Sequence, residues 1–354
     1  MSEKKLLIAL AGNANVGKSV IFNHLTGLHQ HIGNWPGKTV ERAEGTLYFK
    51  GYMIDIVDLP GIYSLSTYSL EELVSRKYIA VERPDVVINV VDASVLERNL
   101  FFTLQLMELE TPMIIALNQM DIAKSKGVQV NVKKLEQLLG VPVMPTVAVK
   151  GVGIDKLLEK AIENVEKKHV RKKPQVTYGE EVEEKIGKLM EKLNEVQIVY
   201  PRRYVAIKLL EGDEDIEREI KRVSPDLLAV ARELAGEIEC IHGHCCSTVM
   251  TSERYEAAGC IARASQQLVS PIKPTIVERL HNFTTHRVTG YLTLALSLLL
   301  IFYSIFTFGD YTSTLLSDLL YGLEPFFTTV FGTGLAGTCK EPLRLSLINN
   351  CNTL

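Results

Sequence analysis

A stretch near the N-terminus has the residue types and the spacing of a phosphate-binding loop. Residues 12–19 follow the pattern G-x-x-x-x-G-K-S, after the apolar run 6–11 and before a helix-like stretch. Glycines in such a loop turn backbone N–H groups toward phosphate oxygens, and the helix N-terminus adds positive potential. We expect Lys18 to reach the β- and γ-phosphates as a catalytic group and Ser19 to ligate Mg²⁺. The predicted phosphate-binding residues are Gly12, Asn13, Ala14, Asn15, Val16, Gly17, Lys18 and Ser19.

A carboxylate at the end of the strand-like run 53–57 is a second candidate for metal and phosphate contacts. Asp58 suits an outer contact to Mg²⁺, and the Gly61 amide can approach the γ-phosphate as a catalytic group. The predicted nucleotide contacts of this segment are Asp58, Leu59, Pro60 and Gly61.

Two further motifs indicate which base is bound. Asp121 ends the motif Asn118-Gln119-Met120-Asp121, after the apolar run 113–117. A carboxylate there accepts two hydrogen bonds from guanine that adenine cannot supply, so the contact discriminates between the bases. Val147 and Ala148 follow the run 141–145, where GTPases often carry a Ser-Ala pair whose backbone touches guanine O6. The serine is missing here.

Each short motif, taken alone, is compatible with an ordinary turn after a strand. All of them occur in the expected order, and each follows a strand-like run. We therefore predict a domain that binds a guanine nucleotide, GTP or GDP.

Composition limits the classes of protein that remain. The chain has 354 residues, 23% of them charged, and a formal net charge of −3, which gives no electrostatic case for a nucleic acid partner. The charged start, Met1–Lys5, runs straight into a strand, so we expect no cleavable signal peptide. Six cysteines beside a cytosolic nucleotide domain indicate reduced thiols or metal ligands rather than disulfides.

One segment is long and apolar enough to cross a membrane. Residues 288–308 carry no charge and are rich in Leu, Ile and Phe, and about 20 such residues span a hydrocarbon core. The alternative is a buried helix of a soluble protein. Arg279 and Arg287 precede the run and Asp310 follows it. The positive flank predicts a protein of the cytoplasmic membrane whose N-terminal domains lie in the cytoplasm.

The rest of the chain divides by pattern. Alternating strand and helix patterns over residues 5–168 predict a mostly parallel sheet with helices on both faces, the ligand lying at the carboxyl edge of the strands. Residues 28–45 and 59–70 lack clear periodicity and are the expected switch loops. The basic stretch 167–174 is the expected boundary between this domain and the next one. Beyond it we predict helices at 180–194, 213–223, 225–240 and 251–269, and one strand at 204–210. The predicted order is a P-loop GTPase domain at 1–168, a small helical domain at 169–275 and the start of a membrane domain at 276–354.

The residues around these motifs resemble one family, ferrous iron transport protein B (FeoB). Residues 34–41 match its N-W-P-G-x-T-V-E, residues 58–65 its D-L-P-G-x-Y-S-L, and residues 91–100 its V-D-A-x-x-L-E-R-N-L. The loop at 12–19 matches GNxNVGKS, although Ala14 stands where most relatives have proline. The likeness is very specific over 5–125 and looser over 175–275, which resembles the family's GDP-dissociation-inhibitor-like region. Residues 285–290 look like the entry to the family's first membrane helix.

The resemblance implies further roles for single residues. Thr39 is similar to the switch I threonine, a catalytic group that binds Mg²⁺ and senses the γ-phosphate. Asn15 is similar to the asparagine that helps hold K⁺ in potassium-activated relatives. Ile62 stands where related enzymes place a glutamine that orients water, so we expect slow hydrolysis. The switch I contacts that the resemblance implies are Gly37, Lys38, Thr39, Val40 and Glu41.

The motifs and the resemblance together predict a slow GTPase that regulates ferrous iron uptake across the cytoplasmic membrane. The resemblance implies Fe²⁺ as the ion transported by the full-length family, a membrane, and small accessory iron-transport proteins as partners. Two alternatives stay open. One is a soluble ribosome- or tRNA-associated GTPase, which shares the loop and the apolar residue after D-x-x-G. The other is a GTP-gated, membrane-anchored switch without transport activity.

The C-terminal part and one cysteine cluster depart from the family pattern. Asp318 and Glu324 interrupt the apolar run 315–337, so a second membrane span there is doubtful. Residues 338–354 are polar, and we interpret them as a truncated or frame-shifted end rather than a naturally short regulator. The cluster Cys240, His242, His244, Cys245 and Cys246 has ligand types that suit Zn²⁺ or Fe²⁺, but its spacing fits no known finger.

Overall fold

The computed structural model describes residues 4–27, 30–65, 69–167, 177–269 and 276–331. The chain forms two compact units, Met1–Ile272 and Lys273–Leu354. The predicted boundary at 167–174, apart from Lys167, and the polar end at 338–354 lie outside the described residues.

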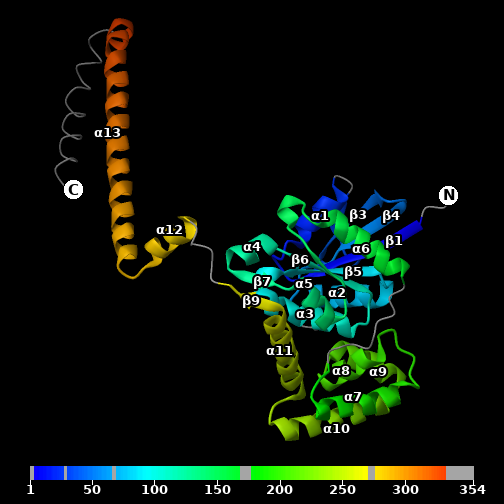
Figure 1. Ribbon diagram of the computed structural model, residues 1–354. Coiled ribbons are helices and arrows are strands. Elements are labelled where there is room, and N and C mark those ends of the chain that lie inside the picture. The colour runs from blue at the N-terminus through cyan, green and yellow to red at the C-terminus, as the bar shows by residue number, and fades with distance from the viewer. Residues whose placement is uncertain (1–3, 28–29, 66–68, 168–176, 270–275, 332–354) are drawn as a thin grey trace. The chain divides into compact units, whose positions relative to one another are not determined.

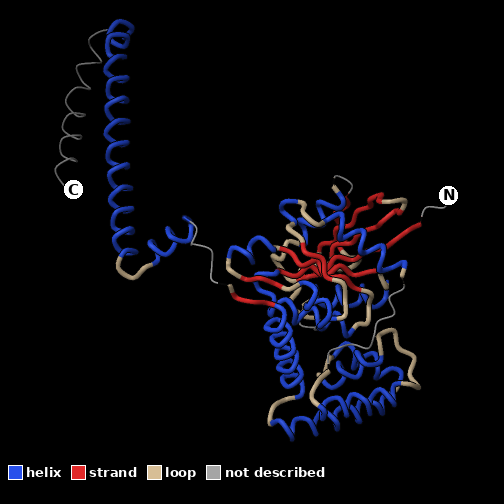
Figure 2. The backbone as a smooth tube through the Cα atoms, viewed as in Figure 1, coloured by secondary structure: helices blue, strands red, loops and turns tan. Residues whose placement is uncertain are grey.

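A seven-stranded sheet forms the centre of the first unit, in the order β2-β3-β4-β1-β5-β6-β8 (Figures 1 and 2). Its five strands from β4 to β8 run parallel, and the edge pair β2 and β3 is antiparallel. The strands are β1 Lys4–Gly12, β2 Gln30–Asn34, β3 Glu41–Phe49, β4 Tyr52–Asp58, β5 Val86–Asp92, β6 Met113–Asn118 and β8 Val143–Pro145.

Helices cover both faces of this sheet because its central strands are apolar on both sides. Every residue of β6 is buried, and all but the last of β5. One face packs against α1 Lys18–Thr26 and α6 Ile154–Glu166. The other packs against α3 Leu96–Glu108, α4 Met120–Ser125, α5 Val132–Leu139 and the short helix Tyr78–Glu82, which follows α2 Leu70–Lys77. The predicted mostly parallel sheet with helices on both faces is confirmed.

The interpretation of residues 28–45 as an irregular loop is wrong for most of that range. Residues 30–34 form β2, and β3 begins at Glu41. Every residue of β3 is partly or fully exposed, so no apolar alternation marks it in the sequence. Only residues 35–40 connect the two strands as a loop.

Helices follow the sheet domain and complete the first unit. They are α7 Glu180–Leu193, α8 Arg202–Leu210, α9 Glu214–Val223, α10 Pro225–His242 and α11 Cys246–Ser265. The predicted strand at 204–210 is wrong, because this segment is α8. All seven of its residues from Tyr204 on are buried, and a short apolar run that is buried all round does not distinguish a strand from a helix.

The predicted helix at 251–269 is also too long at its end. The helix stops at Ser265, and Gln266–Leu268 forms β9, which pairs with β7 Val128–Val130 in a small antiparallel sheet. This pairing joins residues far apart in the sequence, so no local pattern predicts it.

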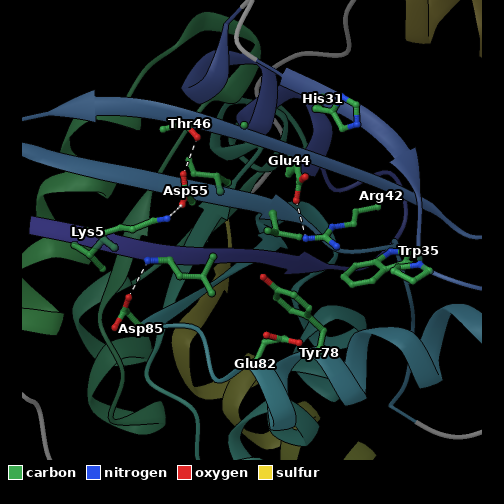
Figure 3. Close-up of a pocket in the computed structure, with 16 residues that line it drawn as sticks. Lys5, His31, Trp35, Arg42, Glu44, Thr46, Asp55, Tyr78, Glu82 and Asp85 are labelled. Carbon is green, nitrogen blue, oxygen red and sulfur yellow. Dashed lines mark hydrogen bonds and ion pairs between the residues drawn. The ribbon is translucent and has the colours of Figure 1, made fainter.

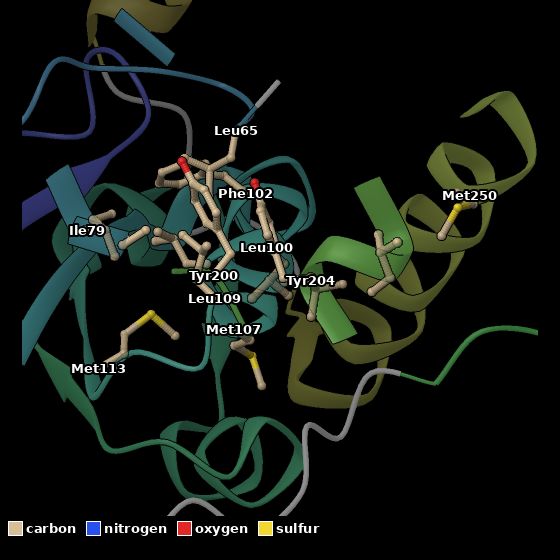
Figure 4. Packing of buried hydrophobic residues seen from close by; sticks show 14 of the residues in the cluster. Leu65, Ile79, Leu100, Phe102, Met107, Leu109, Met113, Tyr200, Tyr204 and Met250 are labelled. Atoms are coloured by element: carbon tan, nitrogen blue, oxygen red, sulfur yellow. The ribbon is translucent and has the colours of Figure 1, made fainter. Parts of the chain in front are cut away.

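The helices and the sheet domain share one apolar core. Leu100, Phe102 and Met107 of α3 belong to the same buried cluster as Tyr204 of α8 and Met250 of α11 (Figure 4). Residues on both sides of the segment 168–176 therefore fold as parts of one compact unit.

Two buried arginines add ionic contacts across the same boundary. Arg76 of α2 is fully buried and donates to Asp213 at 2.7 Å and to Asp215 at 2.8 Å. Arg254 of α11 donates from Nε to Glu108 of α3 at 2.8 Å and also pairs with Glu211. Because a buried charge needs a partner, these contacts fix the helices against α2 and α3.

The second unit consists of α12 Ile276–Thr285 and α13 Thr289–Phe331 in its described part. Thr289–Leu319 is the one helical stretch among the described residues that is long and apolar enough to cross a membrane. No residue in its most apolar window is buried, which argues against the core helix of a soluble protein. The charges at Asp318 and Glu324 do not interrupt the helix, which continues through 315–331 without a break.

Candidate functional site

The phosphate-binding pattern lies between the carboxyl end of β1 and the first turn of α1. Gly12 ends β1 with φ 156°, and a Cβ there would lie 2.6 Å from the Val90 carbonyl oxygen. Gly17 precedes α1 with φ 90°, a left-handed conformation that favours glycine. Asn15 has φ 65°, which asparagine tolerates better than most residues. The backbone therefore curls at the N-terminus of α1, where helix geometry favours anions.

Lys18, Ser19 and Asp58 meet at this loop. The Lys18 ammonium forms an ion pair with Asp58, and both side chains are largely buried. Burial raises the pKa of the Asp58 carboxyl, although Lys18 and a hydrogen bond with Ser19 oppose the increase. The geometry thus places one cation and two oxygen ligands side by side.

The segment after Asp58 is fixed to the loop by backbone hydrogen bonds. The Leu59 N–H donates to the Leu10 carbonyl at 3.0 Å, and the Ile62 N–H donates to the Gly12 carbonyl at 3.2 Å. A Cβ on Gly61 would lie 3.2 Å from the Ala14 Cα, a tight contact that any larger residue could make only if the phosphate loop shifted. Ile62 is 4% exposed and belongs to the apolar core. Its side chain points into that core and cannot orient a water molecule.

Asn118 joins three segments of the site. Its side-chain nitrogen donates to the Val16 carbonyl at 2.8 Å, and its oxygen accepts from the Ala148 N–H at 2.9 Å and from the Thr146 hydroxyl at 3.3 Å. Gln119 donates to the Asn15 carbonyl at 3.2 Å. The phosphate loop, the end of β6 and the loop after β8 therefore form one connected surface at the carboxyl edge of the sheet.

Asp121 lies one turn beyond Asn118, at the start of α4. Its Oδ2 accepts a hydrogen bond from Lys150 at 2.9 Å, and its Oδ1 accepts from the Ile122 N–H at 3.0 Å. The hydrogen bond from Lys150 lowers the pKa of the Asp121 carboxyl, which keeps it ionised as an acceptor. The sequence analysis missed Lys150 and Thr146. Their position beside Val147 and Ala148 is the only signal the sequence offers for them.

The loop between β2 and β3 is tied to the end of α2 through Trp35. The Trp35 N–H donates to the Val40 carbonyl and the Lys38 N–H to the Trp35 carbonyl, both at 2.9 Å. The indole meets the Tyr78 ring edge-on at 5.2 Å, while Thr39 is exposed. Gly37 has φ 70° at the tip of this turn. Among the described residues, no hydrogen bond or ion pair joins Thr39 or Glu41 to the phosphate loop.

The structure thus brings together most of the residues singled out in the sequence. The site consists of three neighbouring segments, Gly12–Ser19, Asp58–Gly61 and Asn118–Asp121. The Ala148 N–H is hydrogen-bonded to Asn118. Met120 is half-buried beside the apolar core and offers no polar group.

The ligand types at the loop fit Mg²⁺ better than they fit a soft metal. Ser19 and Asp58 are neighbouring oxygen donors, the type that Mg²⁺ prefers. The side-chain oxygen of Asn13 is buried without a hydrogen-bond partner among the described residues, so a further acceptor is present inside the loop. Among the described residues no group of three or more His, Cys, Asp or Glu side chains could hold a metal ion. The cluster from Cys240 to Cys246 therefore gains no support as a metal site.

A cavity of about 1090 Å³ lies elsewhere on the same unit, lined by residues of β1, β3 and β4 and of the loops beside them (Figure 3). Trp35, Arg42, Glu44 and Tyr78 are among the side chains that line it. None of the phosphate-loop residues takes part, so this cavity is separate from the candidate nucleotide site.

Comparison with known proteins gives the same assignment for two parts of the chain. The family model described as ferrous iron transport protein B matches residues 6–161. The model described as the FeoB cytosolic helical domain matches residues 178–267.

Curated relatives agree, and they are much longer than this chain. The Fe(2+) transport protein A/Fe(2+) transporter FeoB fusion protein of Porphyromonas gingivalis is 38% identical over 316 residues, which are 86% of this chain and 37% of that protein. The Fe(2+) transporter FeoB of Salmonella typhi is 43% identical over 219 residues, which are 59% of this chain and 27% of that protein.

Solved structures match the first unit. The GDP-bound form of a mutant S. thermophilus FeoB G-domain aligns with a TM-score of 0.70 and 37% identity, covering 74% of this chain and 100% of that chain. The cytosolic domain of the T. maritima protein in its GMPPNP form aligns with a TM-score of 0.63 and 33% identity, covering 74% of this chain and 99% of that chain.

Proposed function

Since the chain belongs to the ferrous iron transport protein B family, with its GTPase domain and cytosolic helical domain, we propose that it regulates Fe²⁺ uptake across the cytoplasmic membrane. GTP binding and hydrolysis follow from the family. The relatives compared above are named as Fe²⁺ transporters, and this chain spans only 27–37% of their length. The role in iron uptake is therefore a proposal.

One observation supports the proposed nucleotide site above all others, and it is the hydrogen-bonding of Asn118. Its side chain joins the phosphate loop to Ala148 and leaves Asp121 three residues further along the same edge. A guanine base over this surface would place its N1–H and 2-amino group on the Asp121 carboxylate. Lys150 donates a hydrogen bond to that carboxylate at 2.9 Å, so a bound guanine would have to share the carboxylate with Lys150 or displace it.

The phosphates would lie at the N-terminus of α1. Backbone N–H groups of residues 14–19 and the Lys18 ammonium would bind the β- and γ-phosphates. Asp58 lies in reach of the same ammonium and would orient it. Mg²⁺ bound by Ser19 and Thr39, with Asp58 as an outer contact, would neutralise charge on the phosphates. The remaining proposed contacts are Gly37, Lys38, Val40, Glu41 and Val147.

Hydrolysis would be slow, because the side chain after Gly61 takes no part in it. Ile62 is buried in the core, so the attacking water would be held by backbone groups such as the Gly61 amide. A K⁺ ion beside Asn15 would add positive charge to that of Lys18 at the phosphates. Asn15 has a left-handed backbone and is exposed at the loop.

We assign residues 1–168 to the GTPase domain, 169–275 to a regulatory helical domain and 276–354 to the start of the membrane domain. The family models at 6–161 and 178–267 support the first two limits. Arg279 and Arg287 precede the apolar helix α13, which supports a cytoplasmic position for the N-terminal domains. Small accessory iron-transport proteins are further candidate partners. No observation favours a ribosome- or tRNA-associated GTPase or a switch without a transport role.

A chimeric transporter tests the role in iron uptake. Residues 1–285 would replace the corresponding segment of the Salmonella typhi relative in cells that lack their own ferrous iron transporter, and uptake of radioactive Fe²⁺ would be measured. We expect uptake with the native segment and a loss of uptake with Lys18→Ala, which removes the phosphate-binding ammonium. Equal uptake by both chimeras, at equal amounts in the membrane, would refute a role of GTP in this transport.

A further inference from the structure

The second unit carries an exposed apolar helix face that the proposed function does not use. Leu280 and Phe283 lie three residues apart in α12 and so share one face of the helix. Leu280 is 62% exposed and Phe283 is 49% exposed. Val288 and Tyr291 follow this helix in the sequence and are also exposed. His281 lies about 200° round the helix from Phe283, on the opposite face.

Hydrogen bonds fix α12 to the start of α13. The Thr289 hydroxyl donates to the Phe283 carbonyl at 2.5 Å, and the Gly290 N–H donates to the His286 carbonyl at 2.7 Å. A Cβ on Gly290 would lie 2.7 Å from the Thr284 carbonyl oxygen, so glycine permits the close approach. Figure 1 shows α12 leaving the foot of α13 at a sharp corner.

This corner lies where the candidate membrane span begins. The span starts at Thr289, and only residues 286–288 separate it from α12. Three residues reach at most about 10 Å, a length comparable with the roughly 5–8 Å headgroup layer on each side of the hydrocarbon core. The end of α12 is therefore restricted to the membrane surface if α13 crosses the bilayer.

Charge and side-chain type agree with that position. Arg279 lies beside Leu280 in α12 and Arg287 lies in the turn after it, so both would be near the level of lipid phosphates if α13 crosses a bilayer. Long cationic side chains at such a boundary extend toward the headgroups while their stems stay apolar. Tyr291, in the first turn of the span, is of the residue type enriched at membrane–water interfaces.

We propose that α12 is an interfacial helix, with Leu280 and Phe283 inserted at the boundary of headgroups and acyl chains. We take the lipid bilayer to be what covers this face, because α12 ends three residues before the candidate span, is hydrogen-bonded to its first turn, and has Arg279 and Arg287 nearby in the sequence. The inference depends on the proposed membrane span of α13. The interfacial position would hold α12 in the plane of the membrane surface, directly before the span.

Tryptophan fluorescence in lipid vesicles tests the position of α12. Trp35 is the only tryptophan, so Trp35→Phe in the full chain removes the native tryptophan fluorescence. Three single reporters are then compared in phosphatidylcholine vesicles with and without 6,7-dibromo acyl chains. They are Phe283→Trp on the apolar face, His281→Trp as the matched control on the opposite face, and Leu299→Trp inside the span.

We expect bromolipid to quench Phe283→Trp more than about twofold more strongly than His281→Trp, and aqueous iodide to show the reverse order. Equal quenching of these two reporters by bromolipid would overturn the inference. So would a blue-shifted Phe283→Trp emission that bromolipid does not quench, because protein rather than lipid would then cover the face. Leu299→Trp separates the two proposals, since its failure to be quenched by 11,12-dibromo lipid would refute the span itself.

Discussion

Replacing Asp213 by Asn tests how strongly the helical domain is held to α2. Arg76 is fully buried, Asp213 is 4% exposed, and their ion pair measures 2.7 Å. Removing one partner of a buried ion pair costs about 3–5 kcal/mol. Asp215 remains as a second partner at 2.8 Å, so we expect the lower end, about 3 kcal/mol. Asparagine still caps α9, because its oxygen can accept from the Ile216 N–H as Asp213 does.

The assay is urea unfolding of a fragment of residues 1–270 at pH 7. Solved relatives that consist of the G domain or the cytosolic domain alone support the use of this fragment. A loss of about 3 kcal/mol corresponds to a decrease in Tm of about 6–12 °C for a domain of this size. Adding Arg76→Met should restore part of the stability, because no buried cation is then left short of a partner.

Glu214→Gln on the same helix is the matched control. Its ion pair with Arg218 measures 3.9 Å between two exposed side chains, so its loss should cost less than about 0.5 kcal/mol. If Asp213→Asn costs no more than this control, Arg76 does not hold the two parts together and the argument is wrong.

Three further predictions concern the site and the buried ion network. Burial disfavours the Glu211 carboxylate, but Lys208 and Arg254 outweigh it and lower its pKa to about 2. Unfolded Glu has a pKa of about 4.3, so the stability gained from its ionisation is complete above that pH and is lost as pH falls toward 2. The difference in unfolding free energy between the native fragment and Glu211→Gln should therefore shrink between about pH 4.5 and pH 2, and a constant difference would contradict the assignment. The fluorescence emission of Trp35 should differ between the GDP complex and the complex with a non-hydrolysable GTP analogue, because ordering of Thr39 would move the indole away from Tyr78. Thr39→Ala should abolish this difference. Identical spectra of the native protein with both nucleotides would disprove a switch role for residues 35–40. GTP turnover should be faster in K⁺ than in Na⁺, and Asn15→Ala should remove this preference; equal turnover by the native fragment in both ions would exclude the potassium site.

The sequence predicts the site well where a motif and a strand end coincide. Gly12–Ser19, Asp58–Gly61 and Asn118–Asp121 each follow an apolar run, and parallel strands bring their carboxyl ends to one edge. At these positions the local pattern is enough to predict the site, because the sheet topology brings the three motifs together. The same reasoning fails for residues 204–210, where burial on all sides conceals the helical period.

Contacts between distant residues are beyond such patterns. Arg76 and Asp213 meet across 137 positions, and Arg254 and Glu108 across 146. Nothing in a charged residue's own neighbourhood tells whether it is solvated or paired inside a core. Lys150 is a similar case, because its distance to Asp121 depends on how the loop after β8 folds back.

The central claim is that the site at the carboxyl edge of the sheet is selective for guanine through Asp121. The most direct test is competition of GTP and ATP against a fluorescent GDP analogue on the fragment 1–270, with the native side chain and with Asp121→Asn. We expect native protein to prefer GTP over ATP by at least about 100-fold, and Asp121→Asn to lose GTP affinity while gaining affinity for XTP. Equal binding of GTP and ATP by the native fragment would contradict the account.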